Sequence, residues 1–344
     1  MIAASSPTRQ PHAAIAHPVP TWQQALADAV TDPAELLAIL QLDSSLLPAA
    51  RRAAAAFALR VPRGFVARMQ PGDPNDPLLR QVLPLGEELR PSPGYVHDPV
   101  GDLASKAAPS VLHKYRGRAL VIATGACGVH CRYCFRRYYP YADDRARGDD
   151  WQTALTYLRQ DVSIEEVILS GGDPLSLNDR RLAELSADLE RIPHLKRLRI
   201  HTRQPVVLPE RVDADLCRWL RSISLQKVIV LHANHAREID STVRSACEAL
   251  AACDATLLNQ AVLLAGVNDD EHTLADLSKA LFAAKVLPYY LHMLDRVQGA
   301  AHFEVPEERA RTLLRRLSAR LPGYLVPKLV REVAGGEAKT PVTL

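Results

Sequence analysis

The region from residue 119 onward alternates short apolar runs with amphipathic stretches, and this alternation restricts the possible folds more than any other feature. The apolar runs, predicted as strands, cover residues 119–124, 166–170, 198–202, 227–232, 257–264 and 288–294. The amphipathic stretches, predicted as helices, cover 153–160, 179–191, 209–221, 239–252 and 271–284. Strands that alternate with helices favour parallel βα units. The chain is therefore predicted to be an α/β protein with a partial (β/α)6 barrel, and an open doubly wound sheet is the alternative.

The rest of the 344-residue chain divides around this region. Residues 1–20 have the composition of a loose arm, and residues 21–110 are predicted as a helical, then proline-rich, region that wraps the body. Within it, Asp32 followed by Pro33 marks a helix start. We expect the barrel over 111–300 and a C-terminal helix with a binding segment over 301–344.

Composition excludes several classes of protein. The net charge of +3 is too small to indicate nucleic-acid binding, and no apolar run is long enough to span a membrane. Six cysteines in 344 residues, without a secretory signal, argue against a disulfide framework. We therefore expect a protein of the reducing cytoplasm. Three of the cysteines fall in predicted helices and are expected to be buried, namely Cys217, Cys247 and Cys253.

Polar motifs follow the predicted strands at their C-terminal ends, where barrel enzymes hold their chemistry. A cysteine-containing loop follows the first strand, SGGDP (170–174) the second, HTRQP (201–205) the third and HANH (232–235) the fourth. Asn259 and Gln260 lie in the fifth strand, and Asp295 closes the sixth. Six polar clusters in phase with six strand ends indicate a single site at this end of the barrel.

The cysteine loop reads GACGVHCRYCFRR and contains Cys127, Cys131 and Cys134. Thiolates at this spacing are typical ligands of an iron–sulfur cluster, and three rather than four of them leave one iron open. The alternative is structural zinc, with His130 or His113 as the fourth ligand. However, structural zinc sites usually have two separated ligand pairs, and no second such pair occurs here.

Two other strand-end motifs are less specific on their own. Gly171 and Gly172 allow a turn to approach a ligand closely, although a plain tight turn is the ordinary explanation. The histidines His201, His232 and His235 also have an ordinary explanation, as hydrogen-bonded core or loop residues. Their positions at strand ends are what make them candidates.

The motifs together resemble the lysine 2,3-aminomutase family of radical S-adenosylmethionine (SAM) enzymes, over roughly residues 75–344. The resemblance is carried by DPLLRQVLP (76–84), HKYRGR (113–118), the cysteine loop, SGGDPL (170–175), TRQPVVLPERV (202–212), NQAVLLAGVND (259–269), PYYLHMLD (288–295) and VPKLVREVAGGEAKTPV (326–342). It implies a [4Fe–4S] cluster, SAM and pyridoxal 5′-phosphate (PLP). It also implies exchange of an α-amino group with a β-hydrogen.

The resemblance assigns cofactor roles residue by residue. Cys127, Cys131 and Cys134 would hold the cluster, and an external electron donor would reduce it. Lys339, after Gly335-Gly336, would form the PLP Schiff base, although without the resemblance it would be an ordinary solvated lysine. Lys114, Tyr115 and Arg118 match the segment that contacts the PLP phosphate in the family. The other residues implied to contact SAM or PLP are Ser170, Gly171, Gly172, Asp173, His232, Asn259 and Gln260.

The resemblance also implies that L-lysine is the substrate. Arg136 would hold its carboxylate, while the neighbouring Arg137 is expected to be solvated. Asp295 and Glu332 would bind its ε-ammonium, with Glu332 one methylene longer than the family's aspartate. Two carboxylates at that end disfavour an anionic side chain such as that of glutamate.

The segments LDRVQGAAHFEV (294–305) and LVREVAGGEAKTP (329–341) most resemble the short family members that serve β-lysylation of elongation factor P. These make (R)-β-lysine, which a separate lysyl ligase attaches to the factor. Three alternatives remain at this point: an aminomutase that makes free β-lysine or another β-amino acid, a radical SAM enzyme without PLP, and a non-catalytic zinc protein.

Overall fold

The central sheet of the protein, seen in a computed structural model that describes residues 21–144 and 151–343, is built from strands in chain order. The six predicted strands are present as β3 (Arg118–Thr124), β4 (Glu166–Gly171), β5 (Arg197–Thr202), β6 (Gln226–Leu231), β7 (Ala255–Val262) and β8 (Leu287–His292). Each pairs in parallel with the next. A doubly wound sheet reverses its strand order at a switch point, and this order has no reversal. The partial-barrel prediction is therefore confirmed.

The same sheet continues beyond these strands at both edges. A hairpin of β1 (Lys106–Ala108) and β2 (Val111–Tyr115) adds antiparallel strands before β3. After β8, the sheet gains the parallel strand β9 (Lys328–Arg331) and then β10 (Thr340–Pro341), which pairs antiparallel with β9. The sequence analysis did not predict these edge strands as part of the barrel sheet. Through β9, the C-terminal segment with Lys339 joins the sheet.

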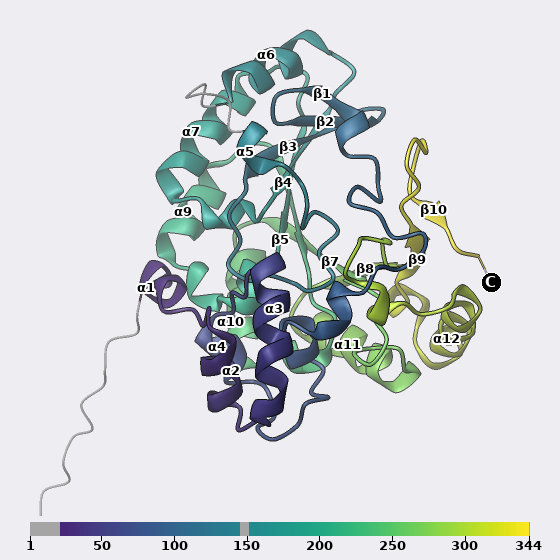
Figure 1. Cartoon of the computed structure of the whole chain (residues 1–344). Helices are drawn as coiled ribbons and strands as arrows, with labels where there is room; N and C mark the ends of the chain where they lie inside the picture. The colour runs from purple at the N-terminus through teal and green to yellow at the C-terminus, as the bar shows by residue number, and fades with distance from the viewer. Residues whose placement is uncertain (1–20, 145–150, 344) are drawn as a thin grey trace, which may run out of the picture.

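Helices that follow the strands cover the outer face of the sheet (Figure 1). They are α6 (Gln152–Gln160), α7 (Asp179–Glu190), α9 (Ala214–Ser222), α10 (Ser241–Ala251), α11 (Glu271–Ala283) and α12 (Glu307–Arg320). Four of them begin after a residue whose side-chain oxygen accepts a backbone N–H, namely Asn178, Asp213, Asp240 and Asp270. The helix predicted to begin at Pro209 begins later, because Pro209–Arg211 forms a 3-10 turn and Asp213 caps α9.

The N-terminal region forms a second hydrophobic cluster against one side of the barrel. Its helices are α1 (Trp22–Ala27), α2 (Pro33–Ile39), α3 (Leu47–Ala56) and α4 (Arg63–Val66), and α2 begins directly after Asp32, as predicted. The buried side chains of this cluster include Leu36 and Phe65, and they pack with Val129 of the cysteine loop and Val207 of the barrel. The predicted arm over 1–20 lies outside the described residues.

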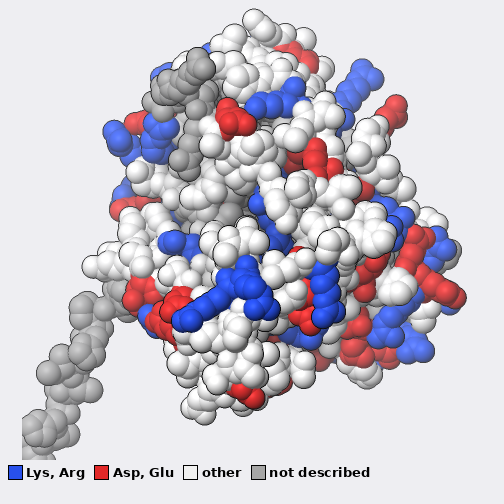
Figure 2. Space-filling model, viewed as in Figure 1, with Lys and Arg blue, Asp and Glu red and all other residues white. Residues whose placement is uncertain are grey.

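Charges of both signs lie on the visible surface (Figure 2), and the three cysteines outside the cysteine loop are buried. Acidic and basic side chains are interspersed on the face in Figure 2. None of the described helices has the length and apolar character needed to cross a membrane. Cys217, Cys247 and Cys253 are buried thiols, as predicted.

Candidate active site

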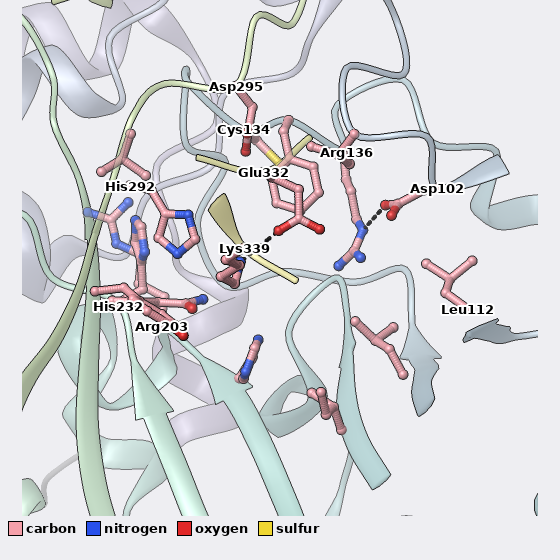
Figure 3. Close-up of a pocket in the computed structure, with 18 of the residues that line it drawn as sticks. Asp102, Leu112, Cys134, Arg136, Arg203, His232, His292, Asp295, Glu332 and Lys339 are labelled. Carbon is pink, nitrogen blue, oxygen red and sulfur yellow. Dashed lines mark hydrogen bonds and ion pairs between the residues drawn. The ribbon is translucent and has the colours of Figure 1, made fainter. Parts of the chain in front are cut away.

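A cavity of about 410 Å³ opens at the C-terminal ends of the strands and collects most of the predicted site residues. Figure 3 shows charged side chains converging on it from the segment after β8 (Asp295), the β9–β10 hairpin (Glu332 and Lys339) and the cysteine loop (Arg136). The predicted residues that line it are Lys114, Tyr115, Arg118, Cys131, Cys134, Arg136, Gly172, Asp173, His201, His232, Gln260, Asp295, Glu332 and Lys339. Cys127, Ser170, Gly171 and Asn259, which were also predicted, are not among the residues that line it.

The N-terminal region holds the cysteine loop in place. The backbone N–H of His130 donates to Arg60 O at 2.9 Å, and that of Arg132 donates to Gln81 O at 2.9 Å. The buried guanidinium of Arg132 donates to both carboxylate oxygens of Glu88, at 2.8 and 2.6 Å. These contacts fix both sides of Cys131, which the sequence leaves on a loop without regular structure.

The three cysteines lie close enough to influence one another. Burial raises the pKa of the Cys134 thiol to about 11, and burial together with Cys134 raises that of Cys127. Arg203, which had no predicted role, donates from Nη1 to Cys131 Sγ at 2.7 Å. A thiolate here therefore has a compensating positive charge beside it.

The glycines of SGGDP serve the packing of two loops. A Cβ on Gly172 would lie 2.3 Å from Ala126 O, and one on Gly171 would lie 2.6 Å from Thr124 O. Gly171 also has φ +116°, which side-chain-bearing residues rarely adopt. The pair thus lets the β4 turn pack against the backbone at the start of the cysteine loop, and Gly172 also lines the cavity.

Asp173 and Asn259 use their side chains to join neighbouring strand ends. Asp173 accepts from Thr202 Oγ1 at 2.7 Å and from Arg203 N at 2.6 Å. Asn259 accepts from Ala233 N at 2.9 Å and donates to Ala233 O at 3.0 Å. Both are buried, so their contacts orient the surrounding loops. Gln260, by contrast, lines the cavity.

Three histidines lie in the cavity wall and are kept neutral by their surroundings. Burial, assisted by Arg203, lowers the pKa of His232 to about 3, and its Nε2 lies 2.8 Å from Tyr133 Oη. Burial also lowers the pKa of His201 and His292, and their Nε2 atoms are buried without a hydrogen-bond partner. Two unsatisfied ring nitrogens in one wall indicate that a polar ligand belongs there.

The other histidines considered from the sequence have protein partners. His235 uses Nδ1 to accept from Arg237 N at 3.1 Å and does not line the cavity. Nδ1 of His130 lies 2.8 Å from Ala58 O, and Nδ1 of His113 lies 2.7 Å from Tyr157 Oη.

Arg136 is oriented from behind by two protein groups. Its Nε donates to Asp102 Oδ2 at 2.7 Å, and its Nη1 donates to Ser170 Oγ at 3.1 Å. The guanidinium is buried, and Asp102 keeps its pKa raised against the cost of burial. Arg137 is not solvated as expected, since its side chain donates to Glu88 at 2.8 Å and stacks over Phe57.

The residues expected at the PLP phosphate separate into two groups. Lys114 Nζ lies 2.7 Å from Asp102 Oδ1 and 3.6 Å from Glu332 Oε1, and Tyr115 donates to Glu332 at 2.5 Å. Arg118 lines the cavity with its guanidinium over the Tyr115 ring, and it has no ion-pair partner among the described residues. Arg118 is therefore the cation of this set that remains available to an anion.

Two carboxylates, those of Asp295 and Glu332, also line the cavity. Burial raises the pKa of Asp295 to about 7, and its side chain has no hydrogen-bond partner among the residues the structure describes. Glu332 accepts from Lys339 Nζ at 2.8 Å (Figure 3). Burial opposes ionisation of Glu332, but Lys339 and Tyr115 hold its pKa below the usual range. The Glu332 carboxylate is thus already paired with a cation, whereas the Asp295 carboxylate is not.

Curated relatives of this chain are named L-lysine 2,3-aminomutase. An L-lysine 2,3-aminomutase from Escherichia coli K12 is 51% identical over 324 residues, which cover 94% of each chain. One from Haemophilus influenzae is 47% identical over 93% of this chain and 94% of its own. One from Clostridium subterminale is 35% identical over 81% of this chain and 67% of its own. The chain belongs to the L-lysine 2,3-aminomutase family.

The other comparisons are weaker. The chain matches no protein-family model. A radical SAM methyltransferase from Sphaerobacter thermophilus, known from a crystal structure, matches 64% of this chain with a TM-score of 0.46 and 18% identity.

The thiols of the cysteine loop fit an iron–sulfur cluster. No three His, Cys, Asp or Glu side chains in residues 21–144 and 151–343 are grouped around a single metal ion. A [4Fe–4S] cluster makes a different demand, because each thiolate binds a separate iron. The three free thiols on one clamped loop, with Arg203 beside Cys131, meet that demand.

Sequence reasoning missed two residues that shape this site. Asp102 lies in a proline-rich segment without any motif, so nothing in the sequence marks it. Arg203 lies inside the TRQP motif, but its contact with Cys131 depends on how the β5 end meets the cysteine loop.

Proposed function

We propose that this chain is a radical SAM, PLP-dependent L-lysine 2,3-aminomutase that converts L-α-lysine to (R)-β-lysine. The observation that carries the proposal is the charge pattern of one cavity. Arg136 is set for a carboxylate, and Asp295 and Glu332 are set for an ammonium, with Lys339 beside them and two cysteines in the wall. L-Lysine has a carboxylate and an ε-ammonium at its two ends, so the pattern matches its charges.

The residues for each cofactor follow from the same pattern. Cys127, Cys131 and Cys134 would hold the [4Fe–4S] cluster, and the loop ends around Ser170, Gly171, Gly172 and Asp173 would border SAM. Lys339 would bind PLP covalently, Arg118 would face its phosphate, and His201 and His292 would satisfy their free nitrogens on bound polar groups. His232 and Gln260 line the same space. When bound, these cofactors supply the radical that removes hydrogen and the carbon–nitrogen double bond through which nitrogen migrates.

The protein's own contribution is to position the substrate and to exclude water. Arg136 would bind the substrate carboxylate while Asp102 and Ser170 fix its orientation. Asp295 and Glu332 would anchor the ε-ammonium, which sets the length of side chain that the cavity accepts. The neutral histidines in the wall avoid placing positive charge beside that ammonium.

We further propose that the product serves β-lysylation of elongation factor P through a separate lysyl ligase. Two segments support this use, because 294–305 and 329–341 resemble the short family members that act there. The alternative is release of free β-lysine, or of another β-amino acid, for metabolism.

One experiment tests the reaction. The protein is reconstituted without oxygen with iron, sulfide and PLP, then given SAM, dithionite and L-lysine, and β-lysine is sought by mass-resolved chromatography. We expect β-lysine from the wild type. We expect Lys339→Ala to lose the visible absorbance of bound PLP but to keep the iron content. A fully loaded wild type that leaves L-lysine unchanged would refute the proposed substrate.

A further inference from the structure

Glu332 and Lys339 face each other across the β9–β10 hairpin. The hairpin pairs Arg331 with Thr340, so the next positions outward are residues 332 and 339. Side chains at opposed positions of an antiparallel pair lie on the same face and interact. Here they form an ion pair of 2.8 Å between Lys339 Nζ and Glu332 Oε2.

This ion pair lies inside the cavity rather than on the outer surface. The Glu332 side chain is 11% exposed and that of Lys339 is 24% exposed. Tyr115 Oη donates to the other oxygen of Glu332 at 2.5 Å, and the Lys339 ammonium lies 5.7 Å from the centre of the Tyr290 ring. The Glu332 carboxylate is thus already oriented to bind an ε-ammonium, and the ammonium of Lys339 occupies that position.

We propose that Glu332 holds two ε-ammonium groups in turn, first that of Lys339 and, once PLP is attached, that of the substrate. This inference rests on the proposed function. Lys339 and L-lysine carry the same four-carbon amine side chain, so a carboxylate that fits one ammonium in charge and size also fits the other. Lys339 therefore occupies the end of the substrate site until cofactor attachment removes it.

The chemistry of attachment explains why the site becomes vacant. The Lys339 ammonium must leave Glu332 and release a proton to solvent before its nitrogen can attack the PLP aldehyde carbon. A C=N bond then forms, and the aldehyde oxygen leaves as water. Glu332 loses its ion-pair partner in this step and is free to receive a new ammonium. The same ion pair slows attachment, because Lys339 must break its 2.8 Å contact with Glu332 before its nitrogen can reach the aldehyde.

The test measures how fast PLP attaches to the PLP-free full chain. Visible absorbance of the C=N bond is followed after mixing, and borohydride reduction with peptide mass spectrometry locates the adduct. We expect Glu332→Gln to attach PLP about three- to tenfold faster than the wild type, the effect of an ion pair of modest strength. Glu332→Asp, which keeps the charge on a shorter side chain, should fall between them. Glu337→Gln, an exposed acid in the same hairpin, is the matched control and should match the wild type.

The outcomes separate this inference from the proposed function. Attachment to Lys339 at the wild-type rate, or more slowly, in Glu332→Gln would overturn the inference and leave the proposed function intact. Failure of the wild type to attach PLP at Lys339 would overturn both. If Glu332→Gln proves unfolded by circular dichroism, the rate of Glu332→Asp decides, and a rate no faster than the wild type counts against the inference.

Discussion

Asp102 lies 2.7 Å from Nε of Arg136 through one carboxylate oxygen and 2.7 Å from Nζ of Lys114 through the other. Lys114 in turn lies 3.6 Å from Glu332, which pairs with Lys339. A chain of alternating charges therefore connects the proposed carboxylate end of the cavity with its ammonium end. Such an arrangement holds each charged group in place before the substrate arrives.

Asp102→Asn is expected to disturb both cations that Asp102 contacts, Arg136 and Lys114. It leaves two cations close together in a buried place, and removing one partner of a buried pair costs about 3 kcal/mol of unfolding free energy. Arg136 would lose its orientation, so we expect KM for L-lysine to rise about tenfold with a smaller change in kcat. Denaturant unfolding and steady-state kinetics measure these effects. Asp188→Asn removes the exposed Arg191 pair and is the control; equal losses in the two variants would contradict the assignment.

Asp295 predicts a pH dependence of substrate affinity. Burial raises its pKa to about 7, so its carboxylate is charged above that pH and neutral below it. An ammonium binds the charged form, and the affinity for L-lysine should therefore rise as pH increases through about 7. Asp295→Asn should bind L-lysine more weakly and lose this pH dependence. Equilibrium binding to the PLP-loaded protein measures it, and an unchanged profile in Asp295→Asn would show that another group is responsible.

The raised pKa of Asp295 also predicts that its contribution to stability falls as pH rises, whereas the affinity for the substrate increases. Folded Asp295 binds its proton more tightly than the unfolded carboxyl does. Its contribution to stability is therefore complete below the ordinary aspartate pKa of 3.8 and is lost as pH rises toward about 7. We expect Asp295→Asn to unfold at a higher temperature than the wild type at about pH 8, with a smaller difference at about pH 5. Thermal unfolding at the two pH values checks this, and a destabilised variant at the higher pH would contradict it.

Gly172→Ala is expected to displace the cysteine loop. Its Cβ would lie 2.3 Å from Ala126 O, and both atoms belong to tightly packed turns. We expect a loss of about 2 kcal/mol of unfolding free energy. Iron bound after reconstitution should fall by roughly half or more, because a shifted loop cannot place all three thiolates. Gly323→Ala, which meets no atom within 4 Å, is the control and should retain its iron.

Arg203 is expected to raise the reduction potential of the cluster held by the cysteines. Its guanidinium donates to Cys131 Sγ at 2.7 Å, and a positive charge there favours the reduced, more negative cluster. Arg203→Gln should shift the reduction potential of the reconstituted protein downward by roughly 60 mV, which equals about 1.4 kcal/mol for one electron. Arg203→Lys keeps the charge and should shift it less. A redox titration followed by electron paramagnetic resonance measures both, and an upward shift in Arg203→Gln would refute this role.

Several features of the fold and site were predictable from local sequence. The strands β3 to β8 appear as buried apolar runs because both faces of a parallel sheet are covered. The starts of the N-terminal helices follow from caps such as Asp32 with Pro33. The cysteine spacing and the strand-end positions of Arg136 and Asp295 also predicted their gathering at one end of the barrel, and the cavity contains both.

One expectation failed because it depended on contacts between distant segments. Arg137 looked solvated, yet Glu88 and Phe57 from the N-terminal region bury it. The ligand contacts of Gly172, Lys114 and Tyr115 stay predictions. The structure adds contacts that local sequence does not show, namely the packing of Gly172 against the Ala126 backbone and the hydrogen bond from Tyr115 to Glu332.

The sequence by itself determined the order of the elements, the kind of sheet and the residues with reactive side chains, since these depend on neighbours within a few positions. The tertiary structure alone decided which charges meet. Asp102 forms ion pairs with Arg136 and Lys114, and Arg203 donates to Cys131. The hairpin of β9 and β10 places Glu332 and Lys339 in the cavity. The physical reason is that a strand end brings together residues far apart in the chain, and Coulomb energy depends on their distance in space and their burial rather than on their separation in sequence.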